Sequence, residues 1–143
     1  MNAPLYNAEV LRLATSNPCD TRLTDPMGSA ERRSVLCGSR ITVDVDLDDA
    51  GRVGAIGMQV SACAYGQASA TLLARHAVGR SASELTAARD AIAHWLAGEG
   101  AIPDWPGLAA LAGVVPYSAR HGAVRLPFEA AADAVNAAIA PAA

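Results

Sequence analysis

The sequence predicts an α+β fold in which a small antiparallel sheet has helices packed on one face. Two observations lead to this prediction. Apolar and polar residues alternate strictly over residues 41–47, as in a half-buried strand, whereas apolar residues recur at helical spacing in much of the chain after residue 63. The 143 residues contain no internal repeat, linker or low-complexity tract, so residues 1–143 are expected to form a single domain.

A short helix is expected near the N-terminus. Residues 5–14 carry apolar residues at helical spacing, and Pro18 ends the pattern because it biases Asn17 away from the helical conformation. Residues 20–33 contain proline, glycine and serine without periodicity, so this segment is predicted to be a loop.

A β-hairpin is predicted next, with strands over residues 41–47 and 53–60 that are joined by a turn rich in aspartate. The aspartates of the polar face and of the turn are expected in solvent. They lack the ligand spacing and the terminal glutamate of an EF-hand calcium loop, so calcium binding is not expected. These residues are Asp44, Asp46, Asp48 and Asp49.

Helical spacing dominates the rest of the chain. One helix is predicted from Cys63 to the region of Gly79, and another from a Ser-x-x-Glu capping box at Ser81 to about residue 98. Residues 108–111 are predicted to form a short helical turn. The last helix is predicted to begin around Pro127, since proline suits a first helical position, and to end near residue 140.

Charge and composition exclude several functions. The net charge is −3, and all eleven cationic residues are arginines scattered along the chain, so binding to nucleic acid or to an anionic membrane is not expected. No apolar run reaches the ~18 residues that cross a bilayer. The N-terminal segment contains Glu9 with no long apolar stretch behind it, so secretion is not expected. A cytoplasmic location is therefore predicted.

The three cysteines are the candidates for chemistry. An odd number in a reducing compartment favours metal binding or thiol chemistry over a disulfide framework. Cys37 precedes the first alternating strand, and Gly38 allows a tight turn beside it. Cys63 lies where a strand ends and a helix begins, and unpaired amide groups at a helix N-terminus favour a thiolate. Either cysteine alone also fits a small buried apolar residue, so the hypothesis depends on the pair.

Several motifs occur in the order in which one family carries them, and in these motifs the chain resembles the U-type iron–sulfur cluster assembly scaffolds, the group of NifU N-terminal domains, IscU and SufU. The resemblance implies their α+β fold and a role in cluster assembly. The motifs are Asn17-Pro18, Cys37-Gly38-Ser39 in place of Cys-Gly-Asp, Asp49-Ala50-Gly51-Arg52, Ala62-Cys63-Ala64 with Ala68-Ser69, and Leu111-Ala112-Gly113-Val114 ahead of Tyr117 and Arg120.

The chain departs from the family at two of the four site positions. Family members use three cysteines and the aspartate of Cys-Gly-Asp, whereas here Ser39 replaces the aspartate and Ala123 stands at the third cysteine. His121 lies one residue before the position of the histidine in the IscU branch. The resemblance implies that Cys37 and Cys63 bind, with His121 as a substitute ligand. Cys19 falls where the family has no ligand.

The resemblance implies an iron–sulfur scaffold or carrier that holds a transient cluster or zinc. A cysteine desulfurase and apo iron–sulfur proteins are the implied partners, and a scaffold or sulfur acceptor is expected rather than a turnover enzyme. Two alternatives remain open at this point. One is a zinc-bound sulfur acceptor for a cysteine desulfurase, and the other is an interaction or regulatory protein that keeps the fold without cluster assembly.

Overall fold

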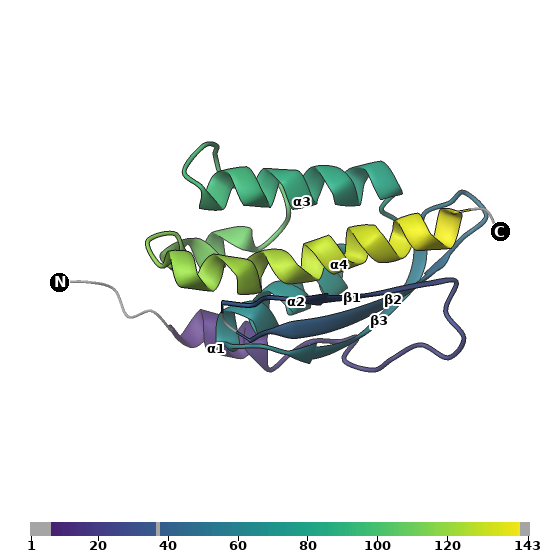
Figure 1. The fold of residues 1–143 in the computed structure, drawn as a ribbon, viewed down its shortest axis with the longest axis horizontal. Coiled ribbons are helices and arrows are strands. Elements are labelled where there is room, and N and C mark those ends of the chain that lie inside the picture. The colour runs from purple at the N-terminus through teal and green to yellow at the C-terminus, as the bar shows by residue number, and fades with distance from the viewer. Residues whose placement is uncertain (1–6, 37, 141–143) are drawn as a thin grey trace.

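The computed structural model describes residues 7–36 and 38–140, and it confirms the predicted α+β class (Figure 1). A three-stranded antiparallel sheet is ordered β1-β2-β3, so the central strand β2 pairs with both neighbours. In chain order the elements are α1 Ala8–Ala14, β1 Gly28–Arg33, β2 Arg40–Leu47, β3 Val53–Ser61, α2 Ala64–His76, α3 Ala82–Leu96, the 3₁₀ helices η1 Leu108–Val114 and η2 Ser118–Arg120, and α4 His121–Ile139.

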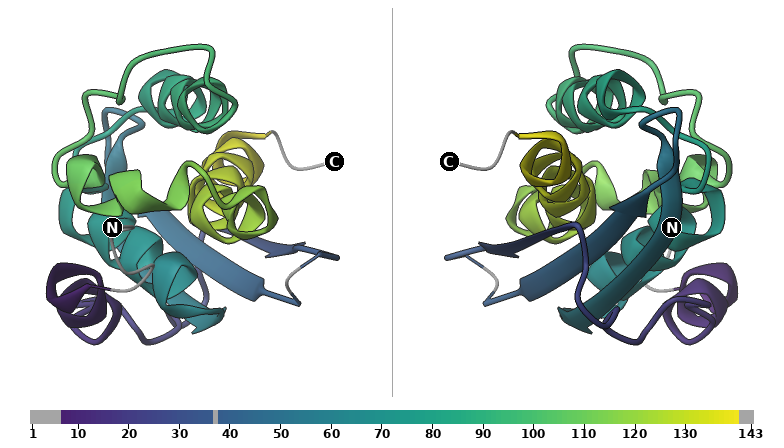
Figure 2. Two further views of the ribbon diagram at one scale, coloured as in Figure 1. Left: turned by 90° about the vertical axis from the view of Figure 1, so that its left-hand side faces the viewer. Right: turned by 90° about the vertical axis from the view of Figure 1, so that its right-hand side faces the viewer.

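The helices cover one face of the sheet. The long helix α4 packs on β1 and β2, α2 packs against β3 and α4, and α1 packs on α2. Helix α3 contacts α4 on the side away from the sheet, which makes a third layer (Figures 1 and 2). The buried side chains of Val43, Val45 and Met58 on the inner face of the sheet contribute to the same core as the helices. Within the part of the chain described, no helix is long and apolar enough to cross a membrane.

The prediction of a loop over residues 20–33 is wrong at its end, because Gly28–Arg33 is the edge strand β1. This strand carries no large apolar side chain, so it lacks the alternation that revealed the hairpin. Its backbone pairs with β2, and α4 covers it so closely that a Cβ on Gly28 would collide with the carbonyl oxygen of Ala134. Pairing and close packing, rather than apolar side chains, define this strand.

The prediction that Asp44 faces solvent is also wrong. Its side chain is completely buried on the outer face of the sheet, where the loop that follows α1 covers it. Its partner across the sheet, Gly57, leaves space for this loop, since a Cβ there would lie 2.9 Å from the backbone nitrogen of Leu23. Asp48 and Asp49 are exposed as predicted.

Helix α4 begins six residues before the predicted position. It starts at His121, so Pro127 lies inside the helix rather than at its first position. Proline lacks the N–H that would bond four residues back and normally interrupts a helix interior. The turn before it is fixed from outside, because the buried hydroxyl of Ser69 on α2 donates a 2.6 Å hydrogen bond to the carbonyl oxygen of Val124.

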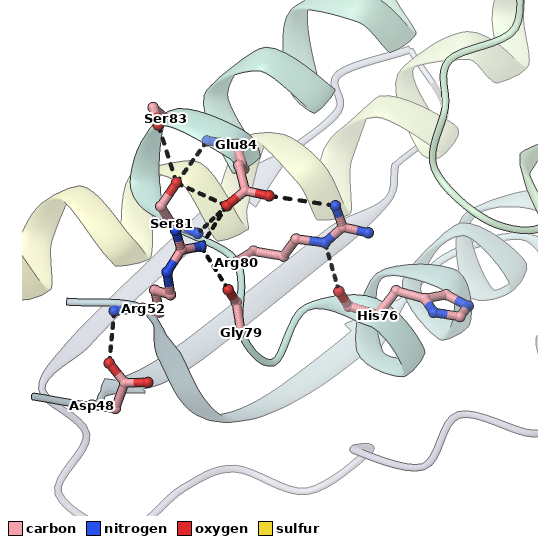
Figure 3. A network of polar contacts seen from close by, with 8 residues as sticks. All are labelled: Asp48, Arg52, His76, Gly79, Arg80, Ser81, Ser83 and Glu84. Atoms are coloured by element: carbon pink, nitrogen blue, oxygen red, sulfur yellow. Dashed lines mark hydrogen bonds and ion pairs between the residues drawn. The ribbon is translucent and has the colours of Figure 1, made fainter. Parts of the chain in front are cut away.

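The predicted capping box at the start of α3 is confirmed, and it joins a wider polar network (Figure 3). Ser81 accepts from the backbone N–H of Glu84, whose carboxylate accepts from the backbone N–H of Ser81. Arg52, in the turn between β2 and β3, donates to Glu84 at 2.6 Å and to the carbonyl oxygen of Gly79 at 2.9 Å. The network therefore fixes this end of the sheet to the junction of α2 and α3.

Candidate functional site

The two segments that carry the predicted cysteines leave the same end of the sheet. Strand β1 ends at Arg33, β2 begins at Arg40 and β3 ends at Ser61, and the pairing register places these three residues side by side. Cys37 lies in the chain between the first two strands, and Cys63 follows Ser61 by two residues. This end is opposite to the one that the network of Arg52 and Glu84 fixes.

A cavity of about 480 Å³ opens at this end of the sheet. Both segments contribute to it, since Gly38 is the neighbour of Cys37 in the chain and Ser61 precedes Cys63. Cys37 itself lies outside the described residues, so its predicted role stays a prediction. The lining residues are Arg33, Ser34, Val35, Gly38, Ser39, Arg40 and Ser61.

Backbone hydrogen bonds close the turn between β1 and β2. The N–H of Gly38 donates to the carbonyl oxygen of Ser34 at 3.0 Å, and the N–H of Ser34 donates to that of Ser39 at 2.8 Å. Gly38 has a φ of +69°, a conformation that residues with a Cβ rarely adopt. Val35 and Leu36 expose 101% and 86% of their surface, so two apolar side chains stand in solvent directly before the position of Cys37.

Cys63 is the N-cap residue of α2 and carries a free, partly exposed thiol. Its side chain makes no capping hydrogen bond, and the first turn of α2 contains no acidic residue. The unpaired N–H groups at the start of α2 therefore meet no carboxylate from the helix's own first turn. The position agrees with the prediction that Cys63 lies where a strand ends and a helix begins.

Ala123, at the position of the third cysteine of the family, is fully buried against the first turn of α2. A Cβ on Gly66 would lie 3.3 Å from the Cβ of Ala123, so α4 and α2 approach each other closely just after Cys63. Residue 123 therefore lies close to the N-terminus of α2, where Cys63 is, but alanine offers only a methyl group there.

His121, the predicted substitute ligand, is the first residue of α4, and its ring is hydrogen-bonded to the end of η1. Nε2 lies 2.8 Å from the carbonyl oxygen of Val115 and 3.2 Å from that of Val114. Carbonyl oxygens only accept hydrogen bonds, so Nε2 carries the proton and only Nδ1 retains a lone pair for a metal in the neutral ring. His121 is not among the residues that line the cavity.

Cys19 lies beside the middle of β3, along the outer edge of the sheet, and not at the end of this strand that leads to Cys63. Its carbonyl oxygen accepts a 3.1 Å hydrogen bond from the backbone N–H of Met58, five residues before Cys63. Burial raises the pKa of the Cys19 thiol, which disfavours the thiolate that metal binding requires. Residues 7–36 and 38–140 contain no group of three histidine, cysteine, aspartate or glutamate residues placed to hold a metal ion.

Sequence analysis missed the two arginines of the cavity. Arg33 and Arg40 face each other across β1 and β2, but this pairing is visible only once residues 28–33 are recognised as a strand. The available signal was that Arg33 and Arg40 flank the segment that contains Cys37 and Gly38.

Neither protein-family models nor curated proteins yield a match to this chain. Solved structures do. The N-terminal part of a nitrogen-fixing NifU-like protein from Brucella abortus is 36% identical with a TM-score of 0.88, and the match covers 94% of each chain.

A protein from the thermophile Fervidobacterium islandicum AW-1, assigned as an iron–sulfur cluster assembly scaffold for the SUF system, has the same fold. Its TM-score is 0.83 at 16% identity, over 92% of this chain and 96% of that one. The level of identity to the Brucella protein over nearly the whole length goes beyond a shared fold. The chain therefore belongs to the U-type family of iron–sulfur scaffold proteins, which includes NifU N-terminal domains and SufU.

Proposed function

We propose that this protein is a scaffold or carrier in iron–sulfur cluster assembly, with Cys37 and Cys63 as its sulfur ligands. The observation that carries the proposal is that Gly38, next to Cys37, and Ser61, two residues before Cys63, line one cavity. Membership of the U-type family and the assignment of the Fervidobacterium protein as a scaffold support the same function.

The donor set of this chain is incomplete for a cluster held by one molecule. A [2Fe–2S] cluster takes four thiolates, and a structural zinc site takes four ligands. This chain offers two cysteines at family positions and Nδ1 of His121, while Ser39 and Ala123 replace the other two ligands. Iron or cluster is therefore cargo here, and a second molecule completes its coordination. Such cargo is released more easily than a fully coordinated cluster.

The proposed partners are a cysteine desulfurase that supplies sulfur and apo iron–sulfur proteins that accept the cargo. The exposed Val35 and Leu36 support contact with another protein beside Cys37, because a partner that covers them would remove two adjacent apolar side chains from water. A partly exposed thiol at Cys63 is accessible for the exchange of sulfur.

Metal and sulfide analysis of anaerobically purified protein tests the proposal. The wild type should hold iron and sulfide, or accept a reconstituted cluster, and Cys37→Ser and Cys63→Ser should each abolish this. His121→Gln should weaken retention if Nδ1 is a ligand. Cys19→Ser is the matched control and should retain the wild-type content. A wild type that neither contains nor accepts metal would overturn the proposal.

Ser39 and Ala123 favour a second candidate function, an interaction or regulatory protein that keeps the fold without cluster assembly. A buried methyl group at residue 123 cannot coordinate any ion. This candidate predicts no metal or cluster in the wild type and no effect of Cys63→Ser on partner binding. Zinc without iron or sulfide would instead support a zinc-bound sulfur acceptor for a cysteine desulfurase.

A further inference from the structure

Strand β1 forms one edge of the sheet and pairs only with β2. The backbone N–H of Ser34, directly after β1, donates to the carbonyl oxygen of Ser39, so the even-numbered residues of β1 direct their backbone groups toward β2. Ser29, Glu31 and Arg33 direct theirs away from the sheet. All three are exposed, and no partner for these backbone groups occurs within residues 7–36 and 38–140. The edge therefore presents a row of free donors and acceptors.

This edge lacks most of the features that protect edge strands. Natural proteins protect them with proline, lysine, bulges, charges or a covering segment. The six residues of β1 contain neither proline nor lysine, and their register with β2 is unbroken. Helix α4 packs on the face of β1, which forms the margin of the sheet in both views of Figure 2. Only the charges of its second half remain, and they determine how another strand can pair with it.

The charges favour one alignment of two copies of β1. A two-fold axis between antiparallel strands brings one residue opposite its own copy. An axis at Glu31 or Arg32 would place like charges directly opposite each other, which is destabilising. An axis at Ala30 brings two methyl groups together instead. Ser29 then lies opposite Glu31 of the second copy, and Gly28 leaves room opposite Arg32 of the second copy.

The same alignment satisfies the backbone groups of the edge. Ser29 and Glu31 of the second copy both direct their N–H and C=O groups to the open side, so they can exchange hydrogen bonds on each side of the axis. The charges near the axis already have partners in their own chain. Glu31 accepts from Arg33 at 2.7 Å, and Arg32 donates to Asp133 at 2.6 Å. Pairing in this register therefore adds backbone hydrogen bonds and leaves no charge without a partner at the axis.

We propose that two copies of this chain associate edge to edge through β1, antiparallel and centred on Ala30, so that their sheets become one continuous sheet. Because the strands are antiparallel, the two cysteine-bearing ends point in opposite directions. The association therefore does not bring the cysteines of the two copies together. It goes beyond the proposed function and does not depend on it.

Sedimentation of the full chain from micromolar to millimolar concentration tests the proposal. A reductant and a chelator are present, so neither a disulfide nor a metal links two chains. The mass should rise from the 14.6 kDa of one chain toward twice that value. A chain that stays monomeric over the whole range would overturn the proposal.

Hydrogen exchange at the two ends of the concentration range tests which surface associates. The amides of Ser29 and Glu31 should exchange about fivefold more slowly at the higher concentration, because only the dimer pairs them. The amides of Ala30 and Arg32 should change less, since β2 already pairs them in a single chain. A dimer in which Ser29 and Glu31 remain unprotected would show that another surface associates.

Glu31→Pro removes one outward N–H without removing a bond between β1 and β2. It should weaken the association by roughly tenfold, because proline cannot donate to the second copy. Glu31→Ala is the matched control, since it loses the same side chain but keeps the N–H, and it should associate much as the wild type does. Equal association of the two variants would contradict pairing through the edge. If Glu31→Pro does not fold, the exchange pattern of the wild type still decides the outcome.

The two proposals fail separately. Association is measured without metal, so a monomeric wild type can still retain iron and sulfide. Conversely, a wild type that holds no metal but associates through β1 would overturn the scaffold function and leave the dimer. Cys37→Ser and Cys63→Ser should associate as the wild type does.

Discussion

Arg22 binds the buried carboxylate of Asp44 through two hydrogen bonds, from Nε to Oδ2 at 2.6 Å and from Nη2 to Oδ1 at 3.0 Å. The backbone N–H of Leu23 and the hydroxyl of Ser29 complete its coordination at 3.0 Å and 2.6 Å. This carboxylate therefore connects the loop after α1 to both β1 and β2. It is the main polar attachment of that loop to the outer face of the sheet.

The Asp44 carboxylate should make stability depend on pH. Burial alone would raise its pKa, but the hydrogen bonds from Arg22, Ser29 and Leu23 outweigh burial and hold the pKa below its ordinary value. A depressed folded-state pKa contributes stability that is complete above the unfolded pKa of about 3.9 and is lost as the pH falls through the folded value.

Asp44→Asn should therefore lower the free energy of unfolding by about 1–3 kcal/mol at pH 7, because the buried network loses its negative charge and one of its two acceptor oxygens becomes an NH2 donor. The deficit should shrink as the pH falls from about 4 through the depressed folded-state pKa of Asp44, where the folded wild type also loses the charge. Urea unfolding at a series of pH values measures both effects. Asp20→Asn is the exposed control, and an equal effect of the two substitutions would contradict the assigned role of Asp44.

Trp105→Ala should be among the most destabilising single changes, by about 3–5 kcal/mol. The indole is 5% exposed, its Nε1–H donates to the carbonyl oxygen of Leu72 at 2.9 Å, and its ring meets Phe128 edge-on at 5.1 Å. Arg80 lies over the same ring at 4.4 Å. Trp105→Phe retains most of the apolar contact and should be milder. Thermal unfolding of both variants checks this order.

Ser81→Ala should destabilise the protein by about 1 kcal/mol, the usual effect of losing an N-cap side chain. Ser83 is the matched control, since it is exposed, lies two residues away, and its hydroxyl contacts that of Ser81 at 3.0 Å without capping the helix. Ser83→Ala should change the free energy of unfolding by less than about 0.5 kcal/mol. Equal effects in denaturant titrations would show that the capping box does not determine the start of α3.

Ala123→Cys should increase metal retention, because it restores a thiol beside the first turn of α2, where Ala123 approaches Gly66. Adding a sulfur to a packed position costs about 1–3 kcal/mol of stability. Ala132→Cys, equally buried on α4, is the control for both effects. We expect zinc or iron retained through dialysis to rise at least threefold only in the first variant. No difference between the two variants would argue against the assignment of residue 123 as the third ligand position.

The sequence predicted those elements whose local pattern agrees with their environment. Alternation revealed the β2–β3 hairpin, and the reciprocal pair of Ser81 and Glu84 revealed the start of α3. Strand β1 was missed because its pairing with β2 and the helix α4 that covers it define it, and not its own side-chain pattern. The burial of Asp44 was missed because the loop that covers it is distant in the sequence. Pro127 misled the prediction of α4 because Ser69, on another helix, supports the turn before it. Each error comes from a contact between segments far apart in the chain.

The candidate site divides in the same way. Cys63 could be placed at a helix N-terminus from sequence alone, because a change from strand to helical periodicity marks that point. The engagement of His121 with Val115 could not be foreseen, since it depends on where η1 ends in space. The arginine pair depended on recognising β1 and was missed with it.

The β2 strand separates charges of opposite sign. Arg40 stands at its beginning beside Arg33, whereas Asp46, Asp48 and Asp49 lie at its other end and in the turn that follows. Arg52 lies in the same turn as the last two aspartates and offsets part of their charge, and Glu31 does the same for Arg33. In an encounter with an acidic protein surface, Arg40 would therefore attract the partner locally to the cysteine-bearing end, an effect that salt weakens.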